Sequence, residues 1–197
     1  FKPGQVVFTD GCWFIRPDAS AVILAGGRSR RMGQDKSLLP IDGIPMIQHI
    51  SNAMQELFAE VIIGANDAAK YEFTGMRVVS DEVTGQGPLM GILSCLEAAG
   101  SDLCFVTGCD IPFVDKTFIL SMISQAEGYD IVMPRSGEGQ FEPLLAVYRK
   151  SVISPARAIL ASGGRRIVEL FSHVKVKFVD LPEGDWYWNL NTIADYT

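Results

Sequence analysis

The sequence has few cysteines and no long uninterrupted run of apolar residues. Its 4 cysteines are irregularly spaced and form no Cys-x-x-Cys pair, which argues against a zinc site or a redox motif. We therefore expect reduced thiols, and Cys109 in particular is interpreted as a small buried apolar residue. No segment is apolar over the length of a bilayer, and the first residues do not have the pattern of a signal peptide. These absences predict a soluble, cytoplasmic protein with no membrane partner.

The sequence also lacks an excess of basic residues. It has 17 Lys and Arg against 23 Asp and Glu, which gives a formal net charge of -6 at pH 7. A protein that coats nucleic acid needs a broad basic surface to neutralise phosphates, so no nucleic-acid partner is expected. An anionic ligand must instead be held by a local basic cluster. With 197 residues, of which 48% are hydrophobic, the chain suits one α/β domain rather than two of ordinary size.

The chain divides into a short N-terminal segment and one main domain. Residues 5–15 read QVVFTDGCWFI, two β-rich runs around Asp10-Gly11, and Asp-Gly between such runs is typical of a β-hairpin. Residues 1–19 are interpreted as an N-terminal hairpin or the tail of an upstream region. From Ser20 onward, short apolar runs alternate with longer helical patterns, as in βαβ units. For residues 20–197 we expect an α/β fold: a three-layer, mostly parallel, Rossmann-like sheet with helices on both faces.

The elements of this domain are predicted from apolar runs and their periodicity. Strands are expected at residues 21–25, 61–65, 78–79, 103–107, 131–133, 143–148 and 174–181. Helices are expected at residues 46–58, 88–99, 116–127, 154–160 and 166–171, and Asp115 is expected to cap the third of them. In an open sheet of this kind, ligands bind where the strands end at their carboxyl edge. The loops after residues 25, 65, 79, 107 and 133 are therefore the candidate binding loops.

The loop after the first expected strand has the composition of a phosphate-binding loop. From Leu24 to Ser37 it reads LAGGRSRRMGQDKS. Its glycines let backbone N–H groups approach one anion closely, and its three arginines and one lysine add positive charge. The glycine spacing does not fit G-x-G-x-x-G, and no Gly-Lys-Ser/Thr closes a P-loop. The loop therefore predicts a nucleoside triphosphate site, but supports neither a dehydrogenase nor a P-loop NTPase.

The whole string resembles the signature of the molybdenum cofactor guanylyltransferases, L-A-G-G-x(n)-R-M-G-x-D-K. This sequence carries it as Leu24, Ala25, Gly26, Gly27, Arg31, Met32, Gly33, Asp35 and Lys36. Further matches follow in order: Gly43, Pro45-Met46, Asn66, Asp81, Gly87-Pro88-Leu89, Gly91, Cys109-Asp110, Pro112 and Asn189-Leu190-Asn191-Thr192. The resemblance extends from about Ser20 to Tyr196. It implies a fold of the nucleotide-diphospho-sugar transferase type and transfer of GMP from GTP to the terminal phosphate of molybdopterin or Mo-molybdopterin, with release of pyrophosphate.

The resemblance also implies roles for individual residues. Lys36, assisted by Arg31 or its neighbour Arg30, is expected to hold the phosphates and to stabilise the departing pyrophosphate. Asp110 follows an apolar strand at the same sheet edge and is expected to bind Mg²⁺, although taken alone it would also suit a turn cap. The expected nucleotide-binding set is Leu24, Ala25, Gly26, Gly27, Gly33, Lys36, Asn66, Asp81, Pro88, Leu89 and Asp110. Candidates for binding the acceptor are Asn189, Asn191, Arg165 and Arg166, for which turn capping and surface exposure are equally good explanations.

Other functions remain open at this point. A cytidylyltransferase or a sugar-1-phosphate nucleotidyltransferase would keep the fold and the metal but change the substrates. A non-catalytic nucleotide-binding or cofactor-binding carrier would keep the fold without the chemistry. In related cytidylyltransferases the first loop reads L-A-A-G, so Ala25-Gly26-Gly27 resembles the guanine-using branch. Other proteins of molybdenum cofactor synthesis are candidate partners.

Overall fold

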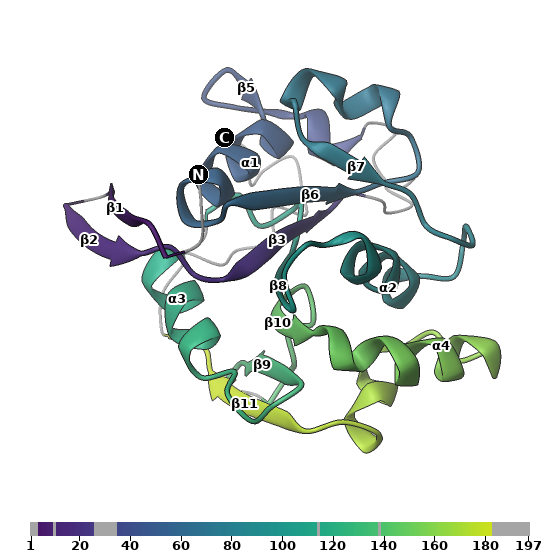
Figure 1. Ribbon diagram of the computed structural model, residues 1–197. Helices are drawn as coiled ribbons and strands as arrows, with labels where there is room; N and C mark the ends of the chain where they lie inside the picture. Colours follow the sequence, from purple (N-terminus) through teal and green to yellow (C-terminus); the bar gives the residue numbers. More distant parts are fainter. Residues whose placement is uncertain (1–3, 10, 26–34, 114, 138, 183–197) are drawn as a thin grey trace.

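The computed structural model describes residues 4–9, 11–25, 35–113, 115–137 and 139–182, and its main feature is a central β-sheet (Figure 1). The strands of this sheet are β3 (Ala19–Leu24), β6 (Glu60–Gly64), β7 (Arg77–Val79), β8 (Leu103–Gly108), β9 (Ile131–Arg135), β10 (Leu145–Arg149) and β11 (Val176–Asp180). In the described part of the chain the sheet is seven-stranded, in the order β11-β9-β10-β8-β3-β6-β7. Strand β10 runs antiparallel to β8 and β9, and the remaining pairs are parallel. The predicted mostly parallel, Rossmann-like sheet is confirmed.

Helices cover both faces of the sheet. The α-helices are α1 (Met46–Leu57), α2 (Pro88–Ala98), α3 (Lys116–Ser124) and α4 (Ile153–Ala161), and the 3-10 helices are η1 (Lys36–Leu38), η2 (Ala69–Thr74), η3 (Lys150–Val152) and η4 (Ile167–Ser172). A first hydrophobic core lies between the sheet and α1 with α3, and a second lies between the sheet and α2 with α4 (Figure 1). In β3, Ala21 and Ile23 belong to the first core, whereas Val22 belongs to the second. The three layers therefore follow from strands that are apolar on both faces.

Helix α1 shows how the sequence pattern produces a covering helix. Its buried apolar residues recur at helical spacing: Met46, Ile47, Ile50, Met54 and Leu57. Burying one such side chain contributes about 1.5–3 kcal/mol relative to leaving it exposed. At the end of the helix, the guanidinium group of Arg16 donates hydrogen bonds to the carbonyl oxygens of Gln55 (3.1 Å) and Glu56 (2.8 Å). These bonds satisfy carbonyl groups that the last turn leaves without intrahelical partners.

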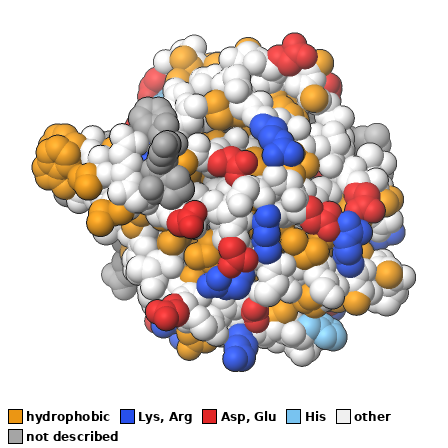
Figure 2. Space-filling view, in the orientation of Figure 1, with side chains coloured by type: hydrophobic (Ala, Val, Ile, Leu, Met, Phe, Trp, Pro, Cys, Tyr) orange, Lys and Arg blue, Asp and Glu red, His pale blue; other side chains and the backbone are white. Residues whose placement is uncertain are grey.

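The predicted N-terminal hairpin is present. It consists of β1 (Val6–Thr9) and β2 (Cys12–Ile15), which pair antiparallel with Phe8 opposite Trp13. The hairpin projects from the rest of the molecule and carries a group of hydrophobic side chains at its surface (Figures 1 and 2). The exposed members of this group are Val6, Phe8, Trp13 and Ile15. The division of the chain after residue 19 stays a prediction.

Several short elements are absent from the sequence-based prediction. They include η1, η2, and the small antiparallel pair of β4 (Pro40–Ile41) and β5 (Ile44–Pro45), whose turn uses the positive φ angles of Asp42 (48°) and Gly43 (83°). A helix or strand of two to six residues has too few positions to show a period, so apolar patterning does not reveal it. The cap at Asp115 is confirmed, since its carboxylate accepts a hydrogen bond from the N–H of Phe118 (3.0 Å). Within the described residues, no helix has both the length and the apolar character needed to cross a membrane.

Candidate active site

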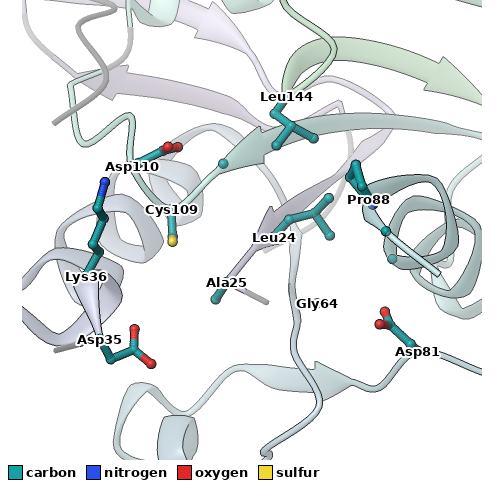
Figure 3. A pocket seen from close by; sticks show the side chains of 13 residues that line it. Leu24, Ala25, Asp35, Lys36, Gly64, Asp81, Pro88, Cys109, Asp110 and Leu144 are labelled. Atoms are coloured by element: carbon teal, nitrogen blue, oxygen red, sulfur yellow. The ribbon is translucent and has the colours of Figure 1, made fainter. Parts of the chain in front are cut away.

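A cavity of about 170 Å³ opens at the carboxyl edge of the sheet, where the sequence places the binding loops (Figure 3). Its walls come from the ends of β3, β6 and β8, from η1, from the residue two positions after β7, and from the beginning of α2. Several residues predicted to bind the nucleotide line it: Leu24, Ala25, Lys36, Asp81, Pro88 and Asp110. The fold therefore brings segments that are far apart in the sequence into one site.

Lys36 and Asp110 line the same cavity. Lys36 is the first residue of η1, and Asp110 lies two residues after the end of β8. In Figure 3 the side chain of Lys36 extends toward Asp110, while Asp81 lies across the cavity from both. A cation and a carboxylate that face one space at a sheet edge are suited to a polyphosphate and its metal ion. The geometry thus brings together the two residues on which the predicted chemistry depends.

The position of the Asp110 carboxylate depends on Gly108. A Cβ atom added to Gly108 would lie 2.5 Å from Oδ1 of Asp110, which is closer than such contacts occur. The turn is held by hydrogen bonds from the Gly108 N–H to the Leu144 carbonyl (3.0 Å) and from the Cys109 N–H to the Leu24 carbonyl (3.1 Å). Gly108 was not predicted as a site residue from the sequence. The available signal was a glycine at the end of an apolar strand, two residues before a candidate metal ligand.

The thiol of Cys109 also lines the cavity and is half-buried. Burial raises the pKa of this thiol to about 12; the charge of Asp110 acts in the same direction, while Lys36 and Lys70 oppose it. Because the thiolate rather than the thiol is the nucleophile, Cys109 is unsuited to covalent catalysis at neutral pH. Cys109 packs against the first core, but it is only partly buried, whereas a buried residue was expected from the sequence.

A further carboxylate, Glu142, lies within electrostatic range of Asp110. Burial raises the pKa of Glu142, and the negative charge of Asp110 raises it further. Glu142 shortly precedes β10, whose antiparallel pairing with β8 places Leu145 opposite Thr107. The sequence gives no indication of this proximity, because the two acidic residues are brought together only by that pairing.

Asn66 and Asp81 follow the ends of β6 and β7 and are hydrogen-bonded to each other. Asp81 lines the cavity, whereas Asn66 is exposed and supports Asp81 from outside. Gly64 ends β6 and lines the cavity as well. A Cβ atom on Gly64 would lie 2.6 Å from Cδ2 of Leu24 and 2.8 Å from Sγ of Cys95, so a larger residue would displace one wall of the site. Gly64 was not predicted as a site residue, although its position inside the apolar VIIGA run was a signal for it.

Helix α2 begins beside the cavity. Gly87 precedes it with a φ of 80°, a left-handed conformation that favours glycine, and Pro88 occupies the first helical position. The N–H of Met90 donates to the Gly87 carbonyl (3.2 Å). The first N–H groups of a helix generally lack intrahelical partners, and together with the helix dipole they favour an anion or another hydrogen-bond acceptor. The side chain of Leu89 is buried in the second core. A ligand would therefore meet the backbone of Leu89 rather than its side chain.

Asp35 lines the cavity and organises the segment around Lys36. Its carboxylate accepts hydrogen bonds from the N–H of Ser37 (3.0 Å) and from the Ser37 hydroxyl (2.7 Å), and it forms an ion pair with Lys70. It therefore acts as the cap of η1. From the sequence, Asp35 was expected as part of the motif, without this structural role.

The candidate acceptor residues that the structure describes lie at the protein surface. Arg165 approaches the segment before α2: its Nη1 is 3.5 Å from the Gly85 carbonyl oxygen, and its own carbonyl oxygen would lie 3.8 Å from a Cβ atom on Gly87. Arg166 instead pairs with Glu169 (3.2 Å) at the start of η4. Other predicted site residues lie outside the described residues, and their roles stay predictions: Gly26, Gly27, Arg31, Gly33, Asn189 and Asn191.

The described residues fit a magnesium ion that binds together with a nucleotide. Among them, no group of three or more His, Cys, Asp or Glu side chains could hold a metal ion by itself. Mg²⁺ in nucleotide sites is usually held by one or two carboxylates together with phosphate oxygens and water. Asp110 supplies such a carboxylate beside Lys36 in the cavity.

Comparison with known proteins gives consistent results. The family model described as "MobA-like NTP transferase domain" matches residues 21–176. A protein of Pelotomaculum thermopropionicum, named "Probable molybdenum cofactor guanylyltransferase", is 39% identical over 177 residues, which cover 90% of this chain and 83% of that protein. A protein of the same name from Carboxydothermus hydrogenoformans is 34% identical over 90% of this chain and 92% of that protein.

The fold also resembles solved structures. The crystal structure of molybdopterin-guanine dinucleotide biosynthesis protein A from Archaeoglobus fulgidus superimposes with a TM-score of 0.76 and covers 90% of this chain and 94% of that one. The two sequences are 23% identical, so this comparison bears on the fold alone. It agrees with the predicted fold of the nucleotide-diphospho-sugar transferase type.

Proposed function

Because the chain belongs to the family of MobA-like NTP transferases, we propose that it transfers GMP from GTP to the terminal phosphate of molybdopterin or Mo-molybdopterin. The products are the guanine dinucleotide form of the cofactor and pyrophosphate. The observation that carries this proposal is that Lys36 and Asp110 line one cavity at the carboxyl edge of the sheet. We further propose that the reaction takes place in the cytoplasm, without a membrane or nucleic-acid partner.

The principal obstacle to this reaction is electrostatic repulsion. An oxygen of the acceptor phosphate must attack the α-phosphorus of GTP, and the bond from that phosphorus to the oxygen that bridges it to the β-phosphorus must break. Two unit charges about 4 Å apart interact by about 4 kcal/mol at an effective dielectric constant of about 20. The amine of Lys36 offsets this repulsion and stabilises the charge that develops on the departing pyrophosphate, and Arg31 is proposed to assist it.

Asp110 is proposed to hold the magnesium ion. When bound, Mg²⁺ would neutralise phosphate oxygens and polarise the reacting phosphoryl group. Asp110 is suited to this role because Gly108 leaves room for its carboxylate at the strand end. Its position beside Lys36 lets the two residues act on the same set of phosphates.

The acceptor needs little help to become a nucleophile. A phosphate monoester is already ionised at neutral pH, because its second pKa is near 6. The reaction therefore requires positioning rather than a strong general base.

The base and ribose of the nucleotide are proposed to bind on the opposite side of the cavity. Asp81 contributes a carboxylate there, and Asn66 holds it in place. Guanine presents an N1–H and an amino group as donors and O6 as an acceptor, so it requires both kinds of partner. The backbone around Leu24, Ala25, Gly26 and Gly27 and at Pro88-Leu89 is proposed to supply them, with Gly33 in the phosphate-binding part of the loop. The acceptor is proposed to contact Arg165, Arg166, Asn189 and Asn191.

Pyrophosphate release tests the proposal. The enzyme is supplied with Mg²⁺, molybdopterin and either GTP, CTP, UTP or ATP, and release is followed for each nucleotide. We expect release with GTP and none when molybdopterin is omitted. Faster release with CTP would overturn the guanine assignment. Binding of GTP without any release of pyrophosphate would favour a carrier function.

A further inference from the structure

Tyr71 lies between the two ends of the phosphate-binding loop. It belongs to η2 and is 1% exposed. Its hydroxyl lies 3.3 Å from the carbonyl oxygen of Ala25, at the end of β3, and 3.0 Å from the hydroxyl oxygen of Ser37, in η1. Ala25 precedes the loop and Ser37 directly follows Lys36. One buried hydroxyl therefore contacts both sides of the segment that carries the lysine.

The positions of the hydroxyl protons indicate whether Tyr71 or Ser37 donates the hydrogen bond between their two hydroxyl groups. The Ser37 hydroxyl donates to the carboxylate of Asp35 at 2.7 Å, and a carboxylate is the strongest acceptor nearby. Ser37 has no second hydroxyl proton, so Tyr71 is the donor between the two hydroxyl groups. Tyr71 has a single hydroxyl proton, which it therefore shares between the hydroxyl oxygen of Ser37 and the carbonyl oxygen of Ala25. Burial also raises the pKa of Tyr71, which keeps this proton in place at neutral pH.

Lys70, which precedes Tyr71 in η2, contacts the residue on the other side of Lys36. Lys70 forms an ion pair with Asp35, which directly precedes Lys36, and its amine lies 5.4 Å from the ring centroid of Tyr71. Two consecutive residues of η2 therefore contact the residues on either side of Lys36. This pattern is difficult to explain by core packing alone, because packing does not require a hydroxyl group.

We propose that Tyr71 is a positioning residue for Lys36: its hydroxyl ties Ser37 to the end of β3 and thereby fixes the direction of the lysine side chain toward the nucleotide phosphates. This inference rests on the proposed function, because it takes Lys36 as the phosphate-binding cation. It adds η2, an element outside the recognised motif, to the nucleotide site.

A double-mutant cycle with Lys36 tests the inference. The dissociation constant of GTP in the presence of Mg²⁺ is measured by calorimetry for the wild type, Tyr71→Phe, Lys36→Ala and the double variant. Loss of one net hydrogen bond predicts weaker binding by about threefold to tenfold in Tyr71→Phe. In the Lys36→Ala background the same change is expected to alter binding by less than about twofold, because there is no amine left to position.

Tyr148→Phe is the matched control. Tyr148 is also fully buried, and its hydroxyl donates to the Pro143 carbonyl at 2.8 Å, but its ring lies in the second core. We expect both phenylalanine variants to lose similar unfolding stability, and GTP binding to weaken in Tyr71→Phe only. Ser37→Ala provides a second variant: it removes the partner of the same hydroxyl and also the hydrogen bond from Ser37 to Asp35, so GTP binding should weaken at least as much as in Tyr71→Phe.

The outcomes distinguish a failure of the positioning role of Tyr71 from a failure of the proposed function. If Lys36→Ala weakens GTP binding but Tyr71→Phe does not, the positioning role is wrong and the proposed function stands. Equal losses from Tyr71→Phe in both backgrounds would also overturn the positioning role, because the hydroxyl would then act independently of the lysine. If Lys36→Ala leaves GTP binding unchanged, the assignment of Lys36 fails and the inference fails with it.

Discussion

Asn66 and Asp81 are joined by two hydrogen bonds that run in opposite directions. The Asn66 amide group donates to a carboxylate oxygen of Asp81 at 2.9 Å, and the backbone N–H of Asp81 donates to the Asn66 side-chain oxygen at 2.9 Å. The pair links the residues after β6 and β7, which are neighbouring parallel strands. It therefore fixes the direction of the Asp81 carboxylate at the cavity wall.

This relationship predicts the effect of changing Asn66. Asn66→Ala removes both hydrogen bonds, so we expect GTP binding to weaken by about threefold to tenfold with little change in stability, because both groups are near the surface. Asn66→Asp is expected to be worse, since it places a second carboxylate beside Asp81. Calorimetric titration with GTP and Mg²⁺ measures both variants. Wild-type affinity in Asn66→Asp would contradict the role given to the pair.

The activity is expected to be sensitive to the addition of a single methyl group at Gly108. In Gly108→Ala the new Cβ atom would meet Oδ1 of Asp110 at 2.5 Å, so the carboxylate must move. Displacement of a catalytic group by about 1 Å can reduce the rate about 100-fold, and we expect a loss of that order in kcat/KM together with a higher requirement for Mg²⁺. Gly137→Ala is the control, because a Cβ atom there has no neighbour within 4 Å. Equal activity of the two variants would show that Asp110 is not held in this way.

Cys109 is expected to be dispensable for the chemistry. Its thiol has a pKa raised to about 12 and is therefore protonated at neutral pH. Cys109→Ala should keep kcat within about threefold of the wild type, with a moderate loss of stability from the smaller side chain. Steady-state kinetics at neutral pH provide the test. A loss of activity of about 100-fold or more in a folded variant would point to a direct catalytic role for the thiol.

Asp130, which is not among the residues that line the cavity, is expected to make part of the folding stability depend on pH. Its carboxylate accepts hydrogen bonds from the Ser151 hydroxyl and from the N–H of Lys175, which lower the pKa of Asp130 below its ordinary value of 3.8. A pKa lower in the folded than in the unfolded state stabilises the fold above the unfolded pKa, and this contribution is lost as the pH falls through the folded pKa. Asp130→Ala should therefore lower the free energy of unfolding by no more than about 1 kcal/mol at neutral pH, because water screens this partly exposed carboxylate, and by less below about pH 4.

Urea unfolding of Asp130→Ala at several pH values measures this difference. Asp180→Ala is the matched control, because Asp180 forms an ion pair with Arg135 at 2.8 Å but remains 80% exposed in its side chain. Asp180→Ala should lower the free energy of unfolding by less than about 0.5 kcal/mol at every pH. If the destabilisation by Asp130→Ala were the same at pH 3 and pH 7, the carboxylate would not be the source of the stability.

Much of the fold could be predicted because its signals are local. Strand β3 is apolar at every position that enters the two cores, and α1 repeats apolar residues at helical spacing. The short η2 has no such pattern. In its segment KYEF the ring of Tyr71 is buried, but charged residues lie on both sides of it in the sequence. The antiparallel direction of β10 was also not predictable, because apolar runs do not encode the direction of pairing.

The candidate site also contains residues that were predictable from the sequence and residues that were not. Lys36 and Asp110 were found from a motif and from their position after apolar strands, because the carboxyl ends of parallel strands meet at one edge. The residues that support them were missed. Gly108 matters through a contact with Asp110, and Tyr71 through hydrogen bonds to Ala25 and Ser37. These contacts arise only when the chain has folded, so no spacing in the sequence indicates them.

The most direct test of the account is the rate of pyrophosphate release from GTP and molybdopterin in Lys36→Ala and Asp110→Ala, measured across a range of Mg²⁺ concentrations. Circular dichroism and thermal unfolding first establish that both variants are folded. Removal of one group that stabilises developing charge usually reduces the rate by about 100-fold to 1,000-fold, and we expect losses of that order in each variant. Excess Mg²⁺ should restore part of the activity in Asp110→Ala and none in Lys36→Ala. Wild-type rates in either folded variant would contradict the claim that these two residues act together on one polyphosphate.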